Sequence, residues 1–379
     1  MNIEQSLKFF TDTSNTVKEL FDAGHCNYCG ACILVCPKNA ISYENMELNV
    51  NDDCIHCGRC LQICSQNLKM SFTSKLANKM DNSSLSKYQP RLKDLPVGSF
   101  ENIYVSRSAK ENVRNSSMIG GTTTSLMLYA LDHSIIDAAL VTDFDSSRGF
   151  PIGKLIAKKE EILASGGSKY LPTFSLEKLT EVVDANDYQS LAITTLPCQA
   201  YAIRKFGSDS KTAVLSSKIK LVLTLFCGTG VPSKEDINLF LKRKKVNGDF
   251  PSLKVRRSKE KRFWRLNPQD QERYIYTTGT NKEHNFSSRQ ILNLKSKNNC
   301  SLLCPDYTGY HSDVSVGAAH MNTNLTITRT ELGERIFQEA VENKYIEIMK
   351  FKPMNYFLIN LMGKNKRENN RLAYQESHY

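Results

Sequence analysis

From about residue 98 onward, short runs of apolar and β-branched residues alternate with segments whose apolar residues recur at helical spacing. The runs that predict strands cover 102–108, 138–142, 191–195 and 220–226, and three more that look antiparallel cover 253–257, 262–265 and 273–278. The segments that predict helices cover 122–133, 176–184, 197–206, 233–245 and 332–343. This alternation of strands and helices is typical of an α/β domain.

The pattern differs at both ends of the chain. Residues 1–25 are interpreted as a short amphipathic helix with its lead-in, and a cysteine-rich unit follows them to about residue 72. The stretch 74–98 is polar and closed by two prolines, which predicts a linker or a surface loop. Residues 363–379 are polar and charged enough to predict a disordered tail. The domains expected at this point are a cysteine-rich unit over 1–75, a linker over 76–97, an α/β part from residue 98, and a basic tail over 353–379.

Composition places the chain among ordinary globular proteins. It has 379 residues, of which 40% are hydrophobic and 23% charged, enough to build two or three domains around buried cores. The first residues show no secretory signal, and the chain contains no run of 18 apolar residues. We therefore expect a cytoplasmic protein that is neither secreted nor inserted in a membrane.

The net charge of +11 is carried by short basic runs at 242–245, 256–262 and 364–367. No aromatic residues are interleaved with these runs and no nucleic-acid-binding motif accompanies them. A solvated basic face is the simpler interpretation, and we expect no nucleic-acid partner. A phosphate-bearing cofactor or an acidic protein partner suits the same charge.

The twelve cysteines carry most of the chemical information. Two motifs, CNYCGACILVCP from Cys26 and CIHCGRCLQICS from Cys54, each have the spacing C-x2-C-x2-C-x3-C, which is typical of 4Fe-4S clusters rather than of zinc. The fourth cysteine of such a motif cannot fold back onto its own cluster, so it binds the other one. One cluster is therefore expected on Cys26, Cys29, Cys32 and Cys64, and a second on Cys54, Cys57, Cys60 and Cys36. This arrangement predicts a bacterial-ferredoxin-like domain.

Four further cysteines are scattered along the rest of the chain. Cys198 and Cys227 each follow an apolar strand, so two adjacent parallel strands would bring their thiols to one edge of a sheet. Cys300 and Cys304 form a close pair in a predicted loop. Together the four predict a third 4Fe-4S cluster. The alternative is four ordinary buried cysteines, which often serve as small core residues.

Two glycine-containing stretches are candidates for a phosphate-bearing cofactor. In SSMIGGTTTSL (116–126), Gly120 and Gly121 precede a predicted helix whose first turn carries Thr122, Thr123 and Thr124. Exposed amides at a helix N-terminus bind anions, although a simply capped helix gives the same pattern. In ASGGSKYLP (164–172), Lys169 supplies a positive charge. No carboxylate pair is spaced for acid–base catalysis, and hydride transfer needs none.

These motifs occur in a series that resembles the family of coenzyme F-420 hydrogenase/dehydrogenase beta subunits. The series is GGTTTSL, GGSKYLP, TTLPCQ, LFCGTG, CPDYTGYHSDVSVG and RTELGERIFQEAVENKYIE, and it covers about residues 98–350. The resemblance implies an N-terminal family region over 98–187 and a C-terminal region over 188–352. It also implies a mixed α/β flavin-binding domain behind the ferredoxin-like domain, so the whole chain is of the α+β or α/β class.

The resemblance also implies roles for individual residues. Gly120, Gly121 and Thr122 match the family's loop beside FAD, and Lys169 and Tyr170 match its Gly-Ser-Lys-Tyr segment. Cys198, Cys227 and Cys304 match its cluster ligands. The family usually places the fourth cysteine where this chain has Ser301, and here the available thiol is Cys300, one residue earlier. Without Cys300, the third cluster would need a fourth ligand other than cysteine.

The resemblance implies hydride exchange between coenzyme F-420 and FAD, with single electrons passing through the clusters to a redox partner. The partner could be a hydrogenase, a formate dehydrogenase or a respiratory complex that brings the chain to a membrane peripherally. Two alternatives stay open. One is a ferredoxin-dependent flavin reductase of a tetrapyrrole pigment, and the other is a non-catalytic electron-relay subunit.

Overall fold

The structure is a computed structural model. It describes residues 16–44, 47–66, 96–145, 147, 150–169, 171–185, 187–228, 234–246, 252–257, 272–277, 283–287, 304–319 and 322–375.

In the described residues between 16 and 66, the N-terminal cysteine motifs form a small unit of three short helices and a hairpin. Its elements are α2 (Val17–Asp22), α3 (Ala31–Val35), β1 (Ile41–Glu44), β2 (Glu47–Val50) and α4 (Arg59–Ile63). Strands β1 and β2 pair antiparallel, with Ile41 opposite Val50. Helices α3 and α4 each begin after a glycine in the left-handed region, Gly30 at φ 84° and Gly58 at φ 72°. The two motifs therefore have the same local backbone.

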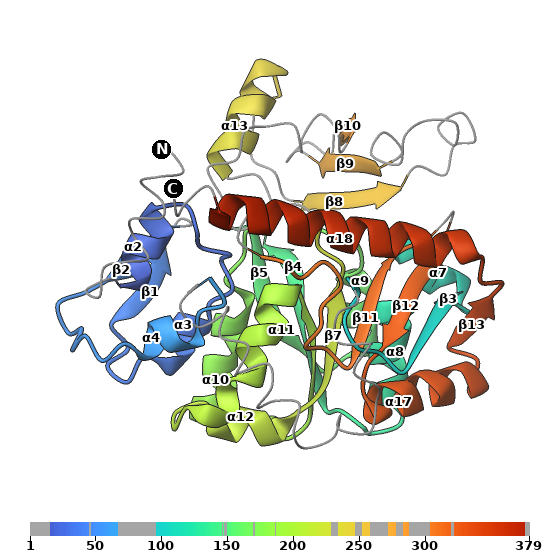
Figure 1. The fold of residues 1–379 in the computed structure, drawn as a ribbon, viewed down its shortest axis with the longest axis horizontal. Helices are drawn as coiled ribbons and strands as arrows, with labels where there is room; N and C mark the ends of the chain where they lie inside the picture. The colour runs from blue at the N-terminus through green and yellow to red at the C-terminus, as the bar shows by residue number, and fades with distance from the viewer. Residues whose placement is uncertain are drawn as a thin grey trace.

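The larger part of the chain is organised by one eight-stranded mixed sheet (Figure 1). Its strands in spatial order are β13 (Ile346–Met349), β3 (Asn102–Ser108), β12 (Asn324–Thr328), β11 (Val314–Ala318), β7 (Ile219–Leu225), β6 (Leu191–Thr195), β4 (Ala138–Asp145) and β5 (Phe150–Ile156). The strands from β11 to β4 run parallel, and antiparallel pairs flank them on both sides. The four predicted strands of the α/β part are confirmed as β3, β4, β7 and β6, whereas the sequence patterns missed β5, β11, β12 and β13.

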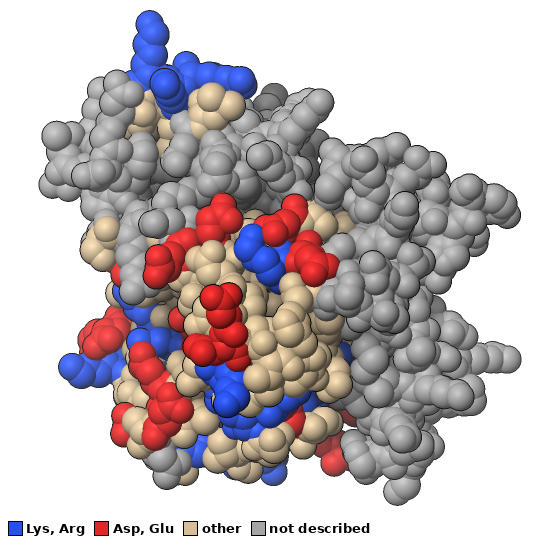
Figure 2. Space-filling model, turned by 90° about the vertical axis from the view of Figure 1, so that its left-hand side faces the viewer, with Lys and Arg blue, Asp and Glu red and all other residues tan. Residues whose placement is uncertain are grey.

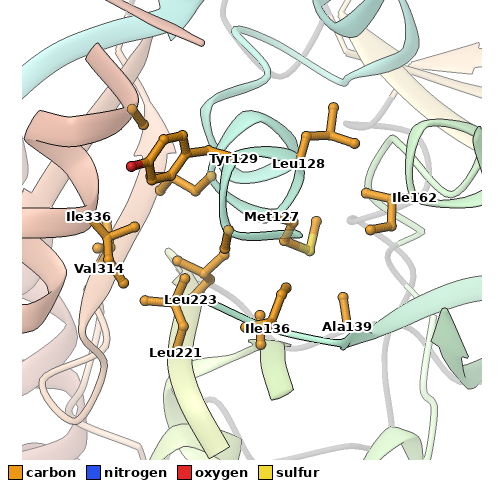
Figure 3. Packing of buried hydrophobic residues seen from close by; sticks show 14 of the residues in the cluster. Met127, Leu128, Tyr129, Ile136, Ala139, Ile162, Leu221, Leu223, Val314 and Ile336 are labelled. Atoms are coloured by element: carbon orange, nitrogen blue, oxygen red, sulfur yellow. The ribbon is translucent and has the colours of Figure 1, made fainter. Parts of the chain in front are cut away.

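Helices cover both faces of this sheet. The helical segments are α7 (Glu111–Ser116), α8 (Thr122–Asp132), α9 (Lys159–Ala164), η2 (Ser175–Leu179), α10 (Thr180–Ala185), α11 (Pro197–Arg204), η3 (Phe206–Ser208), α12 (Ala213–Lys218), α13 (Lys234–Arg243), α17 (Glu331–Glu342) and α18 (Pro353–Gln375). Successive residues of β7 face opposite sides, so Leu221 and Leu223 pack with α8 and α17 while Val222 packs with α10 to α12. Figure 3 shows the first of these cores, with Met127 and Ile336 on either side of Leu223.

The cysteine-rich unit shares the second core. Leu34 and Val35 of α3 and Ile63 of α4 belong to the same buried cluster as Leu176 and Ile193. Each of these five side chains is almost fully removed from solvent. Apolar burial is the main source of stability in such contacts, so the unit is fixed against the sheet domain rather than tethered beside it.

The prediction of a disordered tail over 363–379 is wrong for residues 363–375, which belong to α18. Close packing holds this helix against the rest of the domain. Ile359 is buried, the backbone of Gly363 lies so close to Pro96 that a Cβ would be 2.5 Å from its carbonyl oxygen, and Lys366 is buried. Polar composition missed the helix because its stabilising partners come from distant parts of the chain.

A second, three-stranded sheet has the antiparallel order β10 (Glu283–Ser287), β9 (Glu272–Thr277), β8 (Ser252–Arg257). The predicted strands at 253–257 and 273–278 are thereby confirmed, and the predicted strand at 262–265 lies outside the described residues. Within the described part of the chain, no helix is both long enough and apolar enough to cross a membrane.

Candidate redox site

Two of the scattered cysteines emerge side by side from the main sheet. Strands β6 and β7 pair in parallel with Thr195 opposite Thr224, and the two hydroxyls lie 2.7 Å apart. Cys198 and Cys227 each follow three residues after these paired threonines. The sequence prediction that adjacent parallel strands bring both residues to one edge of the sheet is therefore confirmed.

Cys304 lies on the loop that leads into β11, the next strand of the sheet. The amide of Cys227 donates a hydrogen bond of 2.9 Å to the carbonyl oxygen of Tyr307, three residues after Cys304. Burial raises the pKa of the Cys304 thiol to about 11, and the charges of Asp306 and Cys227 also raise it. Cys304 is thus close enough to Cys227 for their charges to interact. Cys300 lies outside the described residues.

Lys366 of α18 lies beside these three cysteines. Its ammonium donates hydrogen bonds to the carbonyl oxygens of Cys227 at 2.6 Å and Asp306 at 2.9 Å. Burial by itself would lower the pKa of this lysine. Nearby negative charges outweigh burial and raise that pKa above its usual value; they belong to Cys227, Cys304, Asp306 and Cys198. The structure therefore gathers three thiols around one buried cation.

The carboxylate of Asp306 shapes the loop that carries Cys304. It accepts hydrogen bonds from the amides of Thr308, Gly309 and Tyr310, at 3.0, 2.6 and 2.8 Å. Behind the loop, buried Arg329 donates to the hydroxyl of Thr308 at 2.8 Å. This network accounts for the Cys-x-Asp-Tyr-Thr sequence, because the aspartate fixes the turn that follows the cysteine.

Sequence reasoning missed Lys366 and Arg329 as parts of this site. The basic run 364–367, which contains Lys366, predicts only surface charge. Arg329 directly follows β12 and opens the RTELGERIFQEAVENKYIE motif, but that motif gives no sign that its first residue is buried beside Thr308. A basic residue in a polar helical segment gives no sign of burial unless the carbonyl groups that receive its hydrogen bonds are known.

In the N-terminal unit, thiols of both motifs lie close to one another. Burial raises the pKa of Cys32 well above its usual value, and charges from Cys29, Cys26, Cys64 and Cys60 raise it further. Burial raises the pKa of Cys60 to about 11, and Cys57 and Cys54 also raise it. The hydrogen bond to Asp209 raises the pKa of Arg59, and the charges of Cys57 and Cys36 add to this effect. Cys64 thus lies with the first motif and Cys36 near the second, although cluster ligation itself stays a prediction.

The donor chemistry fits multinuclear clusters. The described cysteines are all thiols rather than disulfides. Among the described residues, no group of three or more His, Cys, Asp or Glu side chains closes around a single metal ion. Thiolates are the ligands that hold 4Fe-4S clusters, so the described cysteines fit such a cluster by their chemistry.

The Gly-Gly loop before α8 is built tightly into the main domain. A Cβ at Gly120 would collide with the side chain of Asn324. The Thr122 amide donates to Oδ1 of Asn324 at 3.2 Å, and its hydroxyl lies 2.9 Å from that of Ser106. Thr122 is therefore used to hold the loop, while Thr123 at the same helix start is only half-buried.

The second glycine stretch lies against the first. A Cβ at Gly166 would be 2.8 Å from the carbonyl oxygen of Ser116. Lys169 is buried, donates to the carbonyl oxygens of Ser165 and Gly167, and has its ammonium 3.7 Å from Oδ1 of Asp143. The structure thus joins two segments that the sequence proposed separately. Tyr170 lies outside the described residues.

Comparison with known proteins identifies three matching family models. Residues 103–180 match the N-terminal model of the coenzyme F-420 hydrogenase/dehydrogenase beta subunit, and residues 188–353 match the C-terminal model of the same subunit. Residues 17–68 match a 4Fe-4S dicluster domain. The three matches together extend over most of the chain.

Individual relatives agree with these models. The beta subunit of coenzyme F-420 hydrogenase from Methanothermobacter thermautotrophicus is 27% identical over 293 residues, which are 74% of this chain and 97% of that protein. One of the subunits of the F-420H2 dehydrogenase from Methanosarcina mazei is 24% identical over 365 residues, which are 95% of this chain and 94% of that protein.

The fold is shared with a solved structure. A chain of the F-420-reducing nickel–iron hydrogenase complex from Methanosarcina barkeri matches with a TM-score of 0.61 at 19% identity, covering 75% of this chain and 94% of that one. With the family models on both halves of its α/β part, the chain belongs to the family of coenzyme F-420 hydrogenase/dehydrogenase beta subunits and carries a 4Fe-4S dicluster domain at its N-terminal end.

Proposed function

We propose that this chain is a cytoplasmic iron–sulfur flavoprotein subunit that exchanges hydride between coenzyme F-420 and FAD and passes single electrons to a redox partner. The observation that carries the proposal is the gathering of Cys198, Cys227 and Cys304 at one edge of the sheet. Relatives named as subunits of F-420 hydrogenase and F-420H2 dehydrogenase support the coenzyme. A larger oxidoreductase complex is proposed as the partner, by analogy with the hydrogenase complex of similar fold.

Thiolate ligands at this edge would hold a third 4Fe-4S cluster, whose chemistry is one-electron transfer. Cys198 lies in the first turn of α11, Cys227 two residues after the end of β7, and Cys304 on the loop before β11. Lys366 supplies a buried positive charge that offsets part of the charge of the three thiolates. Asp306 keeps the Cys304 loop in shape through its three amide contacts.

Helix α11 connects this edge with the N-terminal domain. Cys198 lies in its first turn, and Lys205 directly follows its last residue. The Lys205 ammonium donates to the carbonyl oxygen of Gln62 at 2.8 Å, two residues before Cys64. Burial raises the pKa of Tyr201, and the charge of Cys64 adds to this effect. A helix of eight residues, about 12 Å long, therefore leads from Cys198 to the contact with the N-terminal domain.

The joined glycine stretches are the proposed place for FAD. Backbone at Gly120 and Gly121 comes close to neighbouring segments, and the half-buried Thr123 lies at the start of α8. Lys169 brings a buried positive charge to the adjoining loop, where it suits a phosphate or a reduced flavin. Coenzyme F-420 would then meet the flavin as the hydride donor or acceptor.

Anaerobic reconstitution followed by iron and flavin counts tests the proposal directly. We expect about twelve irons and about one FAD per chain, together with bleaching of the flavin when F-420H2 is added. About eight irons would remove the third cluster. A protein that binds no FAD would contradict the hydride-transfer role, and one whose flavin is not bleached would contradict F-420 as its substrate.

A further inference from the structure

The two cysteine motifs have the same backbone but opposite surroundings. A Cβ at Gly30 would be 2.8 Å from both the amide nitrogen of Glu177 and the carbonyl oxygen of Phe174. A Cβ at Gly58, the equivalent position of the second motif, would meet no atom within 4 Å. The first motif is therefore pressed against the main domain at a point where the second motif is open.

Other contacts repeat this difference. The carbonyl oxygen of Cys29 accepts a hydrogen bond of 2.9 Å from the amide of Leu176, and Cys29 is only 6% exposed. Its counterpart Cys57 is exposed. The loop before Cys57 is open as well, with His56 exposed and Ile55 at 56% exposure. Of the two expected clusters, the one held through Cys29 lies inward and the one held through Cys57 lies outward.

The N-terminal domain has more acidic than basic residues, although the whole chain is basic. Residues 16–66 contain six acidic and three basic side chains, whereas the whole chain has a net charge of +11. Asp52 and Asp53 are exposed immediately before the second motif, and Arg59 behind it is engaged with Asp209 through two hydrogen bonds of 2.7 and 2.5 Å. Figure 2, which looks onto the side of the molecule that carries this domain, shows Asp and Glu side chains across that face, interspersed with Lys and Arg.

We infer that residues 52–57, here called the acidic edge, form the docking surface for a redox protein with a basic surface. The inference rests on the proposed function only in that the N-terminal clusters carry electrons. Docking at this edge would place the partner against the exposed Cys57 ligand of the outer cluster. In the transfer step one electron leaves that cluster and reduces the partner by one electron, and no bond forms or breaks. The reverse step is equally balanced.

Opposite charges speed up the encounter of two proteins and do so less as salt is added. The test therefore uses reconstituted full-length protein, reduced with dithionite and desalted, and a lysine-rich cytochrome c as the electron acceptor. Neither flavin nor F-420 is needed. For the variant Asp52→Lys/Asp53→Lys we expect the second-order rate constant at low salt to fall about tenfold, and the difference from the unmodified protein to close at high salt.

Glu160→Lys/Glu342→Lys is the matched control, because it makes the same change of charge at exposed residues of α9 and α17. We expect it to stay within about twofold of the unmodified protein. An equal fall in both variants, or no fall in the first, would overturn the acidic edge as the docking surface. Iron content is measured for every variant so that loss of clusters is not mistaken for loss of docking.

Carbodiimide cross-linking of the unmodified protein gives a second measurement that needs no variant to fold. Cross-links from cytochrome c lysines to Asp52 or Asp53 are expected, and cross-links confined to carboxylates outside residues 16–66 would contradict the inference. F-420H2 failing to reduce the protein, while the rate of its oxidation by cytochrome c still depends on salt as expected, would contradict the proposed function and support the docking surface. If F-420H2 reduces the protein but the acidic edge has no effect, only the docking surface falls.

Discussion

Lys366 donates a hydrogen bond of 2.6 Å to the carbonyl oxygen of Cys227, 139 residues earlier in the chain. This contact makes the C-terminal helix α18 part of the candidate third cluster site. The ammonium is almost fully buried, and its second acceptor is the carbonyl oxygen of Asp306 at 2.9 Å. A buried cation in this place stabilises negative charge on the surrounding thiolates and on any cluster they hold.

Replacing Lys366 with Met removes that cation while keeping a side chain of similar length. Adding an electron to a cluster without the nearby positive charge becomes less favourable, so we expect the reduction potential of the third cluster to fall by about 60 mV or more, a tenfold change for one electron. Redox titration followed by electron paramagnetic resonance measures the shift.

Lys364→Met on the same helix is the control for this change. Lys364 is exposed and pairs with Glu368 at 3.8 Å, so its loss should leave the potential unchanged. Equal potentials in the Lys366→Met variant and the unmodified protein, at equal iron content, would show that the lysine does not act on the cluster.

Replacing Asp306 with Ala should remove the third cluster selectively. Three backbone amides would lose their acceptor, and each buried donor left unsatisfied costs about 1–3 kcal/mol. We expect the iron count to fall by about four while the N-terminal clusters stay. Asp306→Asn keeps one acceptor oxygen, so its iron count should lie between that of the Ala variant and that of the unmodified protein. Loss of all iron in the Ala variant would instead indicate general unfolding.

The sequence predicted those parts of the site that follow from local patterns. It missed the parts that depend on contacts between segments distant in the chain. The apolar runs before Cys198 and Cys227 marked two strands, and parallel pairing then places both residues at the same edge of the sheet. The burial of Lys366 could not be predicted, because it depends on carbonyl groups 60 and 139 residues away in the chain. Strands β12 and β13 were missed for a similar reason, since both pair with β3, more than 200 residues earlier.

The role of Lys169 in flavin binding is tested by Lys169→Met. Because its buried charge is proposed to face the flavin, the variant should bind FAD about tenfold more weakly. Titration with FAD and flavin release during gel filtration measure this change. Lys154→Met is the matched control, because Lys154 binds the same Asp143 at 2.9 Å but is partly exposed. Equal loss of FAD in both variants would point to Asp143 and its neighbours rather than to the charge of Lys169.

Gly30→Ala and Gly58→Ala form a matched pair that tests how the N-terminal domain is fixed to the sheet domain. Both glycines have positive φ, so each substitution carries a backbone cost of about 1–2 kcal/mol. Only the Cβ at position 30 also meets backbone atoms at 2.8 Å, and relieving that overlap requires the first motif to move away from Phe174 and Glu177.

Thermal unfolding followed by the visible absorbance of the clusters should therefore show a larger loss of stability for Gly30→Ala, by about 2 kcal/mol or more beyond Gly58→Ala. Because the first motif lies nearer the sheet domain, Gly30→Ala should also slow electron exchange between flavin and the N-terminal clusters, whereas Gly58→Ala should leave it unchanged. Equal effects of the two substitutions on stability would mean that the two motifs are equally free of the sheet domain, contrary to the close approach at Gly30.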